Sequence, residues 1–334
     1  MKITAKAPCR VDMAGGTLDI WPLYLFHAAP VTVNFAVDRY ASCAIETRAD
    51  ARITLRSRDL HGQEEFESLA ALRAARRYKL PLAAHVVRYF APATGLDLAT
   101  DSEAPAGAGI SGSSTLIIAL AAAFNRLTNA GHKLEKLREI AQNIEARIIR
   151  VPTGCQDYYP AMYGGVSAIE LTEAGVVRKA VAVEANDLNE RVVLAYTGVP
   201  RNSGINNWEV MKAHIGGDRA VHRNFDRIAQ IACAMRQALE KPDWNEVARL
   251  LRQEWTHRKK NAPGISTPLI DRLVEVTRRH GAVGAKVCGA GGGGCVLFLV
   301  DRGAKLRVSE AIQGEGATVL PVRVAPRGVR VSGA

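Results

Sequence analysis

The chain has 334 residues, of which 48% are hydrophobic and 23% are charged. This length suggests two domains, and the apolar content is ample to bury a core in each of them. The formal charge of +11 is scattered through helical segments rather than gathered into a basic block with interleaved aromatic residues, so we expect no nucleic-acid partner. A basic enzyme for anionic substrates explains the charge equally well.

Signals for a membrane or for secretion are not seen in the sequence. No apolar run reaches the roughly 18 residues needed to cross a bilayer, and no basic start precedes an apolar run. The six cysteines form no C-x-x-C pair and no ligand spacing with histidine, which fits a reducing cytoplasm better than a disulfide or zinc framework. We therefore expect a cytoplasmic globular protein that makes no contact with a membrane.

The N-terminal part is predicted to contain a sheet followed by helices. Its β-rich, partly alternating segments are residues 2–12, 31–37, 41–46 and 52–58. Its helical segments are residues 69–78 and 82–93. Strands followed by helices indicate an α+β fold. After the first strand, a turn-rich loop at residues 14–19 brings Asp12 and Asp19 close in sequence to Arg10.

The centre of the chain carries a glycine- and serine-rich stretch, residues 105–115, that runs into an apolar helix predicted over residues 116–127. Its glycines allow backbone conformations closed to other residues, and the N–H groups at a helix start form a cradle for a polyphosphate. Gly107 and Gly112 have the spacing of a Walker loop, but Ser113 stands where that motif requires lysine, which disfavours an ordinary P-loop NTPase. The alternative is a flexible loop before a core helix.

A second functional loop follows an amphipathic helix predicted over residues 133–150, which carries Glu145 and ends before Pro152. The loop at residues 152–165 holds an acid, Asp157, among side chains able to shield it from water. An acid so placed is a candidate general base. The alternative is that Asp157 caps a helix, as many loop aspartates do.

The second half of the chain alternates between strand and helix patterns. Strands are predicted over residues 166–171, 176–183 and 191–196, and helices over residues 218–239, 244–261 and 268–280. A polar loop occupies residues 197–204. We place the domain boundary near residue 185, which divides the chain into residues 1–185 and 186–334.

The last glycine run, residues 289–294, formally satisfies the dinucleotide fingerprint G-x-G-x-x-G. Such a fingerprint must open a helix, whereas this run lies between strand-like residues 286–287 and 296–300. A Rossmann site is therefore disfavoured. The glycines more plausibly allow close approach of a ligand or of another loop.

Three of these stretches, in this order, resemble motifs of the GHMP kinase superfamily, named for galacto-, homoserine, mevalonate and phosphomevalonate kinases. They are Ala7-Pro-Cys-Arg-Val-Asp-Met-Ala-Gly-Gly, Pro105-x-Gly-x-Gly-Ile-x-Gly-Ser-Ser and Gly289-Ala-Gly-Gly-Gly-Gly. Within the superfamily the chain is most similar to the anomeric sugar kinases, above all the D-glycero-D-manno-heptose 7-phosphate kinases. The similar segments are residues 15–22, 154–157, 196–203, 265–268 and 281–284.

The resemblance implies an N-terminal ribosomal-protein-S5-like domain and a C-terminal ferredoxin-like α+β domain. ATP and a sugar would lie in the cleft between them. It implies an ATP- and Mg²⁺-dependent sugar kinase that phosphorylates the anomeric C1 hydroxyl of a sugar or sugar phosphate, with a heptose 7-phosphate as the favoured acceptor. The enzyme would be a cytoplasmic monomer or homodimer.

Roles carry over by position. Asp157 corresponds to the catalytic base and Arg10 to the cation at the transferred phosphoryl group. Ser113 and Glu145 correspond to the Mg²⁺ ligands, although counting back from the helix favours Ser114 over Ser113. The expected nucleotide-binding residues are Pro105, Gly107, Ala108, Gly109, Ile110, Ser111, Gly112, Ser113 and Ser114. The expected substrate-binding residues are Gly16, Thr17, Asp19, Gly154, Gln156, Arg201, Gly291 and Gly292.

The chain departs from the family pattern in several places. Gly112 replaces a usual serine, Leu18 interrupts the usual Gly-Thr-Asp run, and Cys295 ends the third motif. Gly16 and Thr17 stand where galactokinases place a Glu-His pair, which disfavours galactose. The alternatives are a uronic acid, galactose-like or isoprenoid acceptor, and a catalytically silent sugar sensor; for Asp19 the alternative is a cap on residues 20–26.

Overall fold

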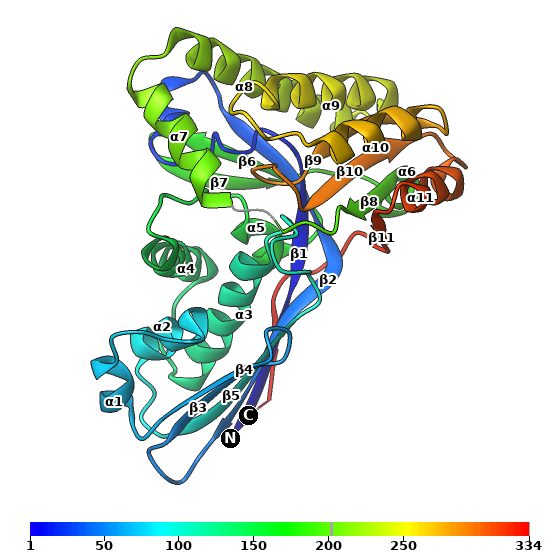
Figure 1. Ribbon diagram of the computed structural model, residues 1–334. Helices are drawn as coiled ribbons and strands as arrows, with labels where there is room; N and C mark the ends of the chain where they lie inside the picture. The colour runs from blue at the N-terminus through cyan, green and yellow to red at the C-terminus, as the bar shows by residue number, and fades with distance from the viewer. Residues whose placement is uncertain (201–202, 334) are drawn as a thin grey trace.

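The structure is a computed structural model that describes residues 1–200 and 203–333, with only the backbone described at residues 203–206. Its described strands form two sheets (Figure 1). The larger has the order β12-β1-β2-β5-β3-β4, with β6 paired to β2 and β7 paired to β6. The smaller has the order β11-β8-β10-β9.

The strands of the larger sheet are β1 (Lys2–Ala14), β2 (Val31–Thr47), β3 (Ile53–Ser57), β4 (Gly62–Phe66), β5 (Leu96–Ser102), β6 (Val166–Thr172), β7 (Gly175–Ala180) and β12 (Arg330–Ser332). Those of the smaller sheet are β8 (Val192–Tyr196), β9 (Ala282–Val287), β10 (Cys295–Val300) and β11 (Thr318–Leu320). All pairs are antiparallel except β3 with β5, among the described residues.

The helices in the first half of the chain are η1 (Leu23–Phe26), α1 (Leu69–Ala74), α2 (Pro81–Phe90), α3 (Gly112–Leu127), α4 (Leu134–Ile149) and α5 (Tyr158–Tyr163). Those in the second half are α6 (Ala185–Arg191), α7 (Ser203–Ile215), α8 (Arg219–Glu240), α9 (Trp244–Arg258), α10 (Pro268–Arg278) and α11 (Lys305–Gly314). In Figure 1, α2, α3 and α4 lie along one side of the larger sheet, and α8 and α9 lie together at its upper end.

The strand β1 carries charged residues of the site in its buried half. Its first residues alternate between exposed and buried, whereas its last eight residues are buried without alternation. The change follows from packing, because both α3 and α8 contact β1. Arg10 and Asp12 lie in this buried half and are almost fully removed from solvent. Buried charges need partners, so this segment must be surrounded by polar groups.

One hydrophobic core joins the two sheets. It contains Val11 of β1, Val33 of β2, Met235 of α8, Leu194 of β8 and Leu297 of β10. The division of the chain near residue 185 therefore remains a prediction. The strand β12 lies in the second half of the chain but joins the larger sheet, because Ser332 of β12 pairs with Thr4 of β1.

Most predicted elements are present with shifted ends, and the expected α+β content is observed. Two predicted strands, residues 31–37 and 41–46, are a single strand, β2. Its register against β1 shifts between Pro8 and Cys9, where β2 carries extra residues as a bulge. That bulge falls in the gap between the two predicted strands.

Several elements were missed. The predicted helix at residues 69–78 ends at Ala74 as α1, and the predicted loop at residues 152–165 contains α5. The unpredicted elements are β4, β5, α6, α7, α11, β11 and β12. The strand β5 alternates buried and half-buried residues, so its pattern of leucines and aspartates carried a strand signal that its acidic residues masked.

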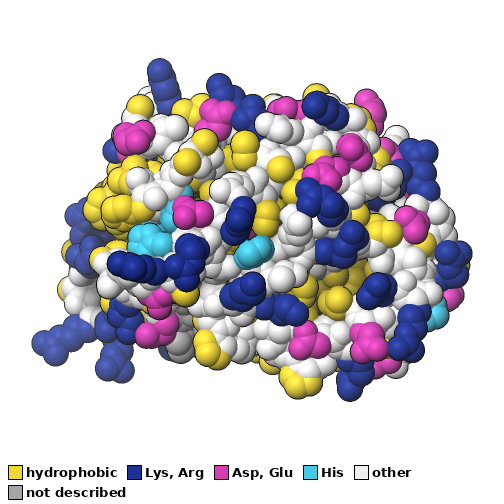
Figure 2. Space-filling model, turned by 90° about the horizontal axis from the view of Figure 1, so that it is seen from above, with side chains coloured by type: hydrophobic (Ala, Val, Ile, Leu, Met, Phe, Trp, Pro, Cys, Tyr) yellow, Lys and Arg dark blue, Asp and Glu magenta, His cyan; other side chains and the backbone are white. Residues whose placement is uncertain are grey.

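Within residues 1–200 and 203–333, no helix combines the length and apolar character needed to cross a membrane. Figure 2 shows one face of the molecule, on which Lys and Arg side chains are interspersed with Asp and Glu. On this face the positive side chains do not form a separate block.

Candidate active site

Four predicted loops meet at one cleft. The first loop, after β1, the central loop before α3 and the loop between α4 and α5 all line it, and the glycine run between β9 and β10, called the third loop below, reaches its edge. The predicted site residues that line the cleft are Arg10, Gly16, Thr17, Asp19, Pro105, Gly107, Ala108, Gly109, Ser111, Gly112, Ser113, Ser114, Glu145, Gly154, Gln156 and Asp157.

The central loop presents the start of α3 to the cleft. Gly107 and Gly109 have φ of +69° and +78°, a region that favours glycine. Ser111 is the N-cap of α3 in the left-handed region. The backbone N–H of Arg10 donates to the carbonyl of Ile110, so the loop is fixed to β1. Among the described atoms, the Oγ of Ser111 is buried without a hydrogen-bond partner, which leaves it and the unpaired N–H groups of the helix start suited to phosphate oxygens.

The helix α3 begins at Gly112, so Ser113, Ser114 and Thr115 occupy its first turn, as the sequence suggested. The side chain of Ile110 is fully buried in the hydrophobic core and is not among the cleft-lining residues described. Its predicted role in nucleotide binding would therefore depend on its backbone.

Glu145 of α4 lies against the first turn of α3. Ser113 Oγ donates to its Oε1 at 2.6 Å, Ser114 Oγ to its Oε2 at 2.9 Å, and the hydroxyl of Tyr158 to the same Oε2 at 2.6 Å. Burial raises the pKa of Glu145, and the three hydroxyl groups oppose that rise. Ser113 is exposed and lines the cleft, whereas Ser114 is buried. Both predicted serines thus contact Glu145, and Ser113 is the one open to a ligand.

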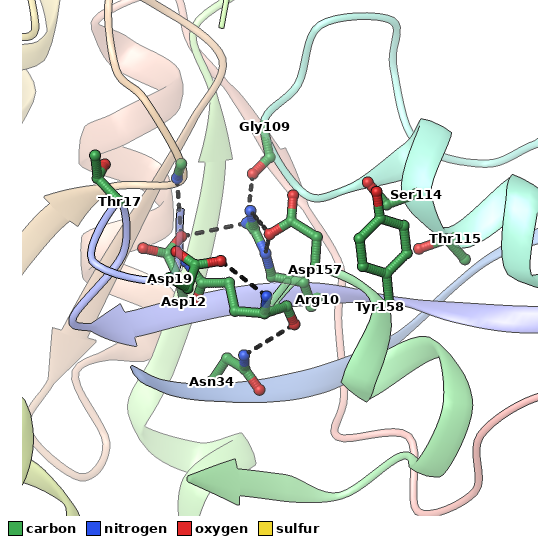
Figure 3. A network of polar contacts seen from close by, with 12 residues as sticks. Arg10, Asp12, Thr17, Asp19, Asn34, Gly109, Ser114, Thr115, Asp157 and Tyr158 are labelled. Carbon is green, nitrogen blue, oxygen red and sulfur yellow. Dashed lines mark hydrogen bonds and ion pairs between the residues drawn. The ribbon is translucent and has the colours of Figure 1, made fainter. Parts of the chain in front are cut away.

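Arg10 connects the base candidate to the floor of the cleft (Figure 3). Its Nε and NH2 donate to Asp157 Oδ1 at 2.9 and 2.6 Å, and its NH1 donates to Asp12 and to the carbonyl of Gly109. Burial would lower the pKa of Arg10, but Asp157 and Asp12 raise it. The guanidinium group is therefore held charged between two carboxylates.

Asp157 occupies the N-cap position of α5, but its side chain makes no capping hydrogen bond. Its carboxylate receives the guanidinium of Arg10 instead, and 24% of its side chain is exposed. The capping alternative is therefore not the arrangement observed. What remains is an acid that is open to the cleft and held in place by a cation.

Asp12 is buried and connects the first loop to the third loop. Its carboxylate is bonded to Lys286 of β9 and accepts from the backbone N–H of Gly289 at 2.8 Å. Burial would raise the pKa of Asp12, but Lys286 and Arg10 lower it well below the usual range. Lys286 is itself fully buried. Sequence reasoning treated it as part of a strand leading into the glycine run and missed this role.

Asp19 is enclosed by the loop between α4 and α5. Its Oδ2 accepts from the backbone N–H of Gln156 at 2.8 Å, and a Cβ added to Gly154 would stand 2.0 Å from the same oxygen. The glycine at position 154 is what permits this close approach. The N-cap of η1 is Pro22, so the predicted alternative, in which Asp19 caps the following segment, is not supported. Burial and the charge of Asp157 raise the pKa of Asp19 to about 6.

Arg258, the last residue of α9, reaches the first loop from the other side. Its NH2 donates to the carbonyl of Gly16 at 2.8 Å and to Glu254 at 2.6 Å, and its NH1 donates to the hydroxyl of Thr17 at 3.1 Å. Arg258 and Glu254 are both buried. In the sequence they form an i, i+4 pair on a helix, a pattern typical of exposed surfaces, and so they were missed.

Most glycines of the third loop lie against other segments of the protein and not in the cleft. A Cβ at Gly294 would stand 2.7 Å from the carbonyl oxygen of Ala108, and one at Gly291 would stand 2.7 Å from that of Ile265. The N–H of Gly292 donates to Ile265. Gly289 and Ala290 line the cleft, but Gly291 and Gly292 are not among its described lining residues. The arrangement does not support direct substrate contact by Gly291 and Gly292. Two uses were predicted for this glycine run, close approach of a ligand or of another loop, and the structure shows the second. Arg201 lies outside the described residues.

Comparison with known families explains why these loops meet. The profile of the GHMP kinases N terminal domain matches residues 71–165, and that of the GHMP kinases C terminal domain matches residues 235–318. Together the two ranges make up more than half of the chain. The chain belongs to the GHMP kinase family. The first range contains the central loop, Glu145 and Asp157, and the second contains Arg258 and the third loop.

Among relatives of this GHMP kinase, a D-glycero-alpha-D-manno-heptose 7-phosphate kinase from Campylobacter jejuni is 27% identical over 335 residues, which cover 98% of each protein. A solved structure of a C. jejuni protein designated a sugar kinase has a TM-score of 0.78 and 26% identity, covering 99% of this chain and 98% of that one. A D-glycero-D-manno-heptose 1-phosphate kinase from Bacteroides thetaiotaomicron has a TM-score of 0.79 at 24% identity and covers 99% of each chain. The two-domain GHMP kinase fold with mixed helix and sheet is thereby confirmed.

Proposed function

We propose that this GHMP kinase transfers the γ-phosphoryl group of ATP to the anomeric C1 hydroxyl of a sugar or sugar phosphate, with a heptose 7-phosphate as its preferred acceptor. One observation carries the proposal. An acid, Asp157, is held by Arg10 in a cleft that is also lined by the start of α3 and by a second, buried carboxylate, Asp19.

The nucleotide phosphates belong at the central loop. Supporting this, the start of α3 faces the cleft and Ser111 Oγ is buried without a partner among the described atoms. Backbone N–H groups and the positive end of the α3 dipole would bind the β- and γ-phosphates. Phosphoryl transfer demands positioning and charge neutralisation more than covalent chemistry, and a rigid loop of this kind supplies the positioning.

The pair of Ser113 and Glu145 suits Mg²⁺, because a carboxylate and a hydroxyl group are the oxygen ligands that this ion prefers. Ser113 Oγ already lies 2.6 Å from Glu145 Oε1. We infer that these two residues hold Mg²⁺ when the nucleotide is present. The bound ion would neutralise charge on the β- and γ-phosphates.

The chemical step is assigned to Asp157. The C1 hydroxyl oxygen of the acceptor forms a new bond to the γ-phosphorus, the bond from that phosphorus to the bridging oxygen of ADP breaks, and the hydroxyl proton goes to Asp157. Arg10 keeps Asp157 oriented, because its guanidinium donates twice to that carboxylate. It also places positive charge beside the group in transit.

The sugar is assigned to the first loop and its supports. Asp19, Thr17 and Gly16 line the cleft on one side of Asp157, and Gly154 and Gln156 enclose Asp19 from the other side. A buried carboxylate makes strong, directional hydrogen bonds to hydroxyl groups and penalises an acceptor that lacks them. A polar pocket of this kind favours a sugar over an isoprenoid alcohol.

The acceptor class is tested by measuring ADP release with ATP and Mg²⁺ on a panel of hexoses, uronic acids, heptose 7-phosphates and mevalonate. We expect the highest kcat/KM on a heptose 7-phosphate, with the product phosphorylated at C1. Turnover on mevalonate alone would assign the protein to the isoprenoid branch. Intact ATP binding without turnover on any acceptor would indicate the silent sensor.

A further inference from the structure

Three histidines from three different elements meet away from the cleft. They are His27 at the end of η1, His214 in α7 and His222 in α8. One ring nitrogen of each lies within 4.8 Å of the corresponding nitrogens of the other two. The Nε2 atoms of His27 and His214 are 2.8 Å apart, and the rings of His214 and His222 stack with centroids 3.8 Å apart. Such a gathering needs an explanation.

The hydrogen bonds of the cluster fix where two of its protons lie. The Nδ1 of His27 is 2.7 Å from Asp226 Oδ1, and the Nε2 of His222 is 2.8 Å from the carbonyl oxygen of His214. A carboxylate and a carbonyl only accept, so each of these nitrogens carries the proton in the neutral ring. The other nitrogen of each ring, Nε2 of His27 and Nδ1 of His222, is then left with a lone pair, and that of His27 accepts a hydrogen bond from His214 Nε2.

His214 lies in the middle and is almost fully buried. Its Nδ1 is buried and, among the described atoms, has no hydrogen-bond partner. Because its Nε2 is hydrogen-bonded to the lone pair of His27 Nε2, the proton of neutral His214 lies on Nε2 and its lone pair on Nδ1. A buried polar atom without a partner is uncommon in a native fold and marks a place where an unseen group can bind.

We propose that His27, His214 and His222 form a binding site for a first-row divalent metal ion, with Zn²⁺ as the expected occupant. Neutral imidazole is a preferred ligand of this ion, and the Zn–N distance is about 2.0 to 2.1 Å. Two nitrogens bound to a tetrahedral zinc ion lie about 3.3 Å apart, so metal binding would open the hydrogen bond between His27 and His214 and turn the stacked rings of His214 and His222 toward the ion. Asp226, bonded to the outer nitrogen of His27, has the position of the carboxylate that orients a ligating histidine.

The site joins three segments, one of which, α7, also reaches the cleft. α7 packs against both η1 and α8. Near its other end α7 carries Asn207, which lines the cleft and accepts a hydrogen bond from the hydroxyl of Thr17 at 3.4 Å. An ion held by the three histidines would fix the far end of α7 without touching the reacting groups. The role is therefore structural, and the site is separate from the Mg²⁺ assigned to Ser113 and Glu145.

The test is Co²⁺ and Zn²⁺ binding to the full-length protein after removal of metal with a chelator, in buffer containing Mg²⁺. We expect one equivalent of Co²⁺ to bind and give visible ligand-field absorption, Zn²⁺ to displace it, and Zn²⁺ to raise the Tm. His222→Gln should abolish all three effects. Asp226→Asn should weaken the affinity about 10- to 100-fold, the usual loss when the partner of a ligating histidine is removed. His280→Gln, at an exposed histidine outside the cluster, is the matched control and should bind like wild type.

Three outcomes would overturn the proposal. The first is the absence of stoichiometric binding to the wild-type protein. The second is metal binding that is unchanged in both single variants, His222→Gln and Asp226→Asn. Because Asp226 is half exposed, Asp226→Asn should fold even if His222→Gln does not. The third is an intense thiolate-to-cobalt band, which would place the metal on cysteine.

Discussion

Arg10 donates two hydrogen bonds to a single oxygen of Asp157: its Nε and NH2 lie 2.9 and 2.6 Å from Oδ1. The second oxygen of Asp157 points away from the guanidinium group (Figure 3). The two oxygens therefore have different tasks. One anchors the side chain, and the other is available to take a proton from an acceptor hydroxyl group.

The first prediction follows from that geometry. Asp157→Asn retains the shape of the side chain and loses its ability to accept a proton. We expect kcat to fall at least about 10²-fold, the usual contribution of a general base. Titration calorimetry should show unchanged ATP binding, and a thermal melt should show a folded protein. Near wild-type turnover would mean that Asp157 is a structural partner of Arg10.

The second prediction separates the two serines bonded to Glu145. Ser113 is exposed to the cleft, so Ser113→Ala should raise the Mg²⁺ concentration needed for half-maximal activity and change stability little. Ser114 is buried, so Ser114→Ala leaves a buried carboxylate oxygen short of a donor and should lower the free energy of unfolding by about 1 to 3 kcal/mol. Mg²⁺ titrations and urea denaturation of both variants make the comparison. The reverse pattern would assign the metal to Ser114.

The third prediction concerns Asp19 and the sugar. Asp19→Ala removes a hydrogen bond between a charged acceptor and a substrate hydroxyl, which should raise the sugar KM by roughly 10²-fold and leave the ATP KM nearly unchanged. Initial-rate measurements with each substrate varied in turn check this. Equal changes in both constants would show general damage to the cleft.

Asp19 also gives a pH dependence of stability. Burial and the charge of Asp157 raise its pKa to about 6 in the folded protein from 3.8. The folded state thus holds this proton more tightly than the unfolded chain, so the stability that Asp19 contributes is complete below about pH 4 and is lost as pH rises to about 6. Asp19→Asn avoids that loss and should be more stable than wild type by about 2 to 3 kcal/mol above pH 7. The gap between the two proteins should close at pH 4; a gap that did not vary with pH would refute the assignment.

The fourth prediction uses the buried pair of Arg258 and Glu254. Arg258→Met leaves a buried carboxylate without its partner and should cost about 3 to 5 kcal/mol of stability. Adding Glu254→Leu removes that carboxylate and should restore most of the loss. The sugar KM should remain raised in the double variant, because Gly16 and Thr17 still lack their donor. A normal sugar KM in the double variant would limit Arg258 to the stability of α9.

The fifth prediction addresses the phosphate of a heptose 7-phosphate, which needs a cation. We assign that cation to Arg201, which lies outside the described residues. Arg201→Ala should lower kcat/KM for the phosphorylated sugar by about 10- to 100-fold, the value of a charge-assisted hydrogen bond, and leave the unphosphorylated sugar unaffected. Arg279→Ala, at the exposed arginine that follows the last residue of α10, is the control. Equal losses on both sugars would remove this role.

Local patterns in the sequence were enough to predict the loops of the site and many of the elements that carry them. Glycines fixed the turns, the period of apolar residues placed Glu145 on a helix, and the strand-like flanks of residues 289–294 excluded a Rossmann reading. These features depend on near neighbours in the chain, which is why a single sequence shows them.

The missed residues depend on packing between distant segments. Lys286 and Asp12 are far apart in sequence and meet because β9 is carried beneath the first loop. Glu254 and Arg258 look like a surface pair until both are buried against that loop. No pattern along the chain states which face of a helix or strand a distant loop will cover, so these partners became visible only in the fold.

The pairing of β12 with β1 has a consequence for synthesis of the protein. The segment that includes Thr4, Ala5 and Lys6 is paired on one side with β2 but must wait for residues 330–332 before its other side is closed. Until those residues leave the ribosome, this edge of the sheet offers unpaired backbone groups to any neighbouring chain. The strand β12 then forms the edge of the sheet itself, and because it is only three residues long it offers few unpaired groups to another chain. Its removal should first become apparent as aggregation of newly made protein.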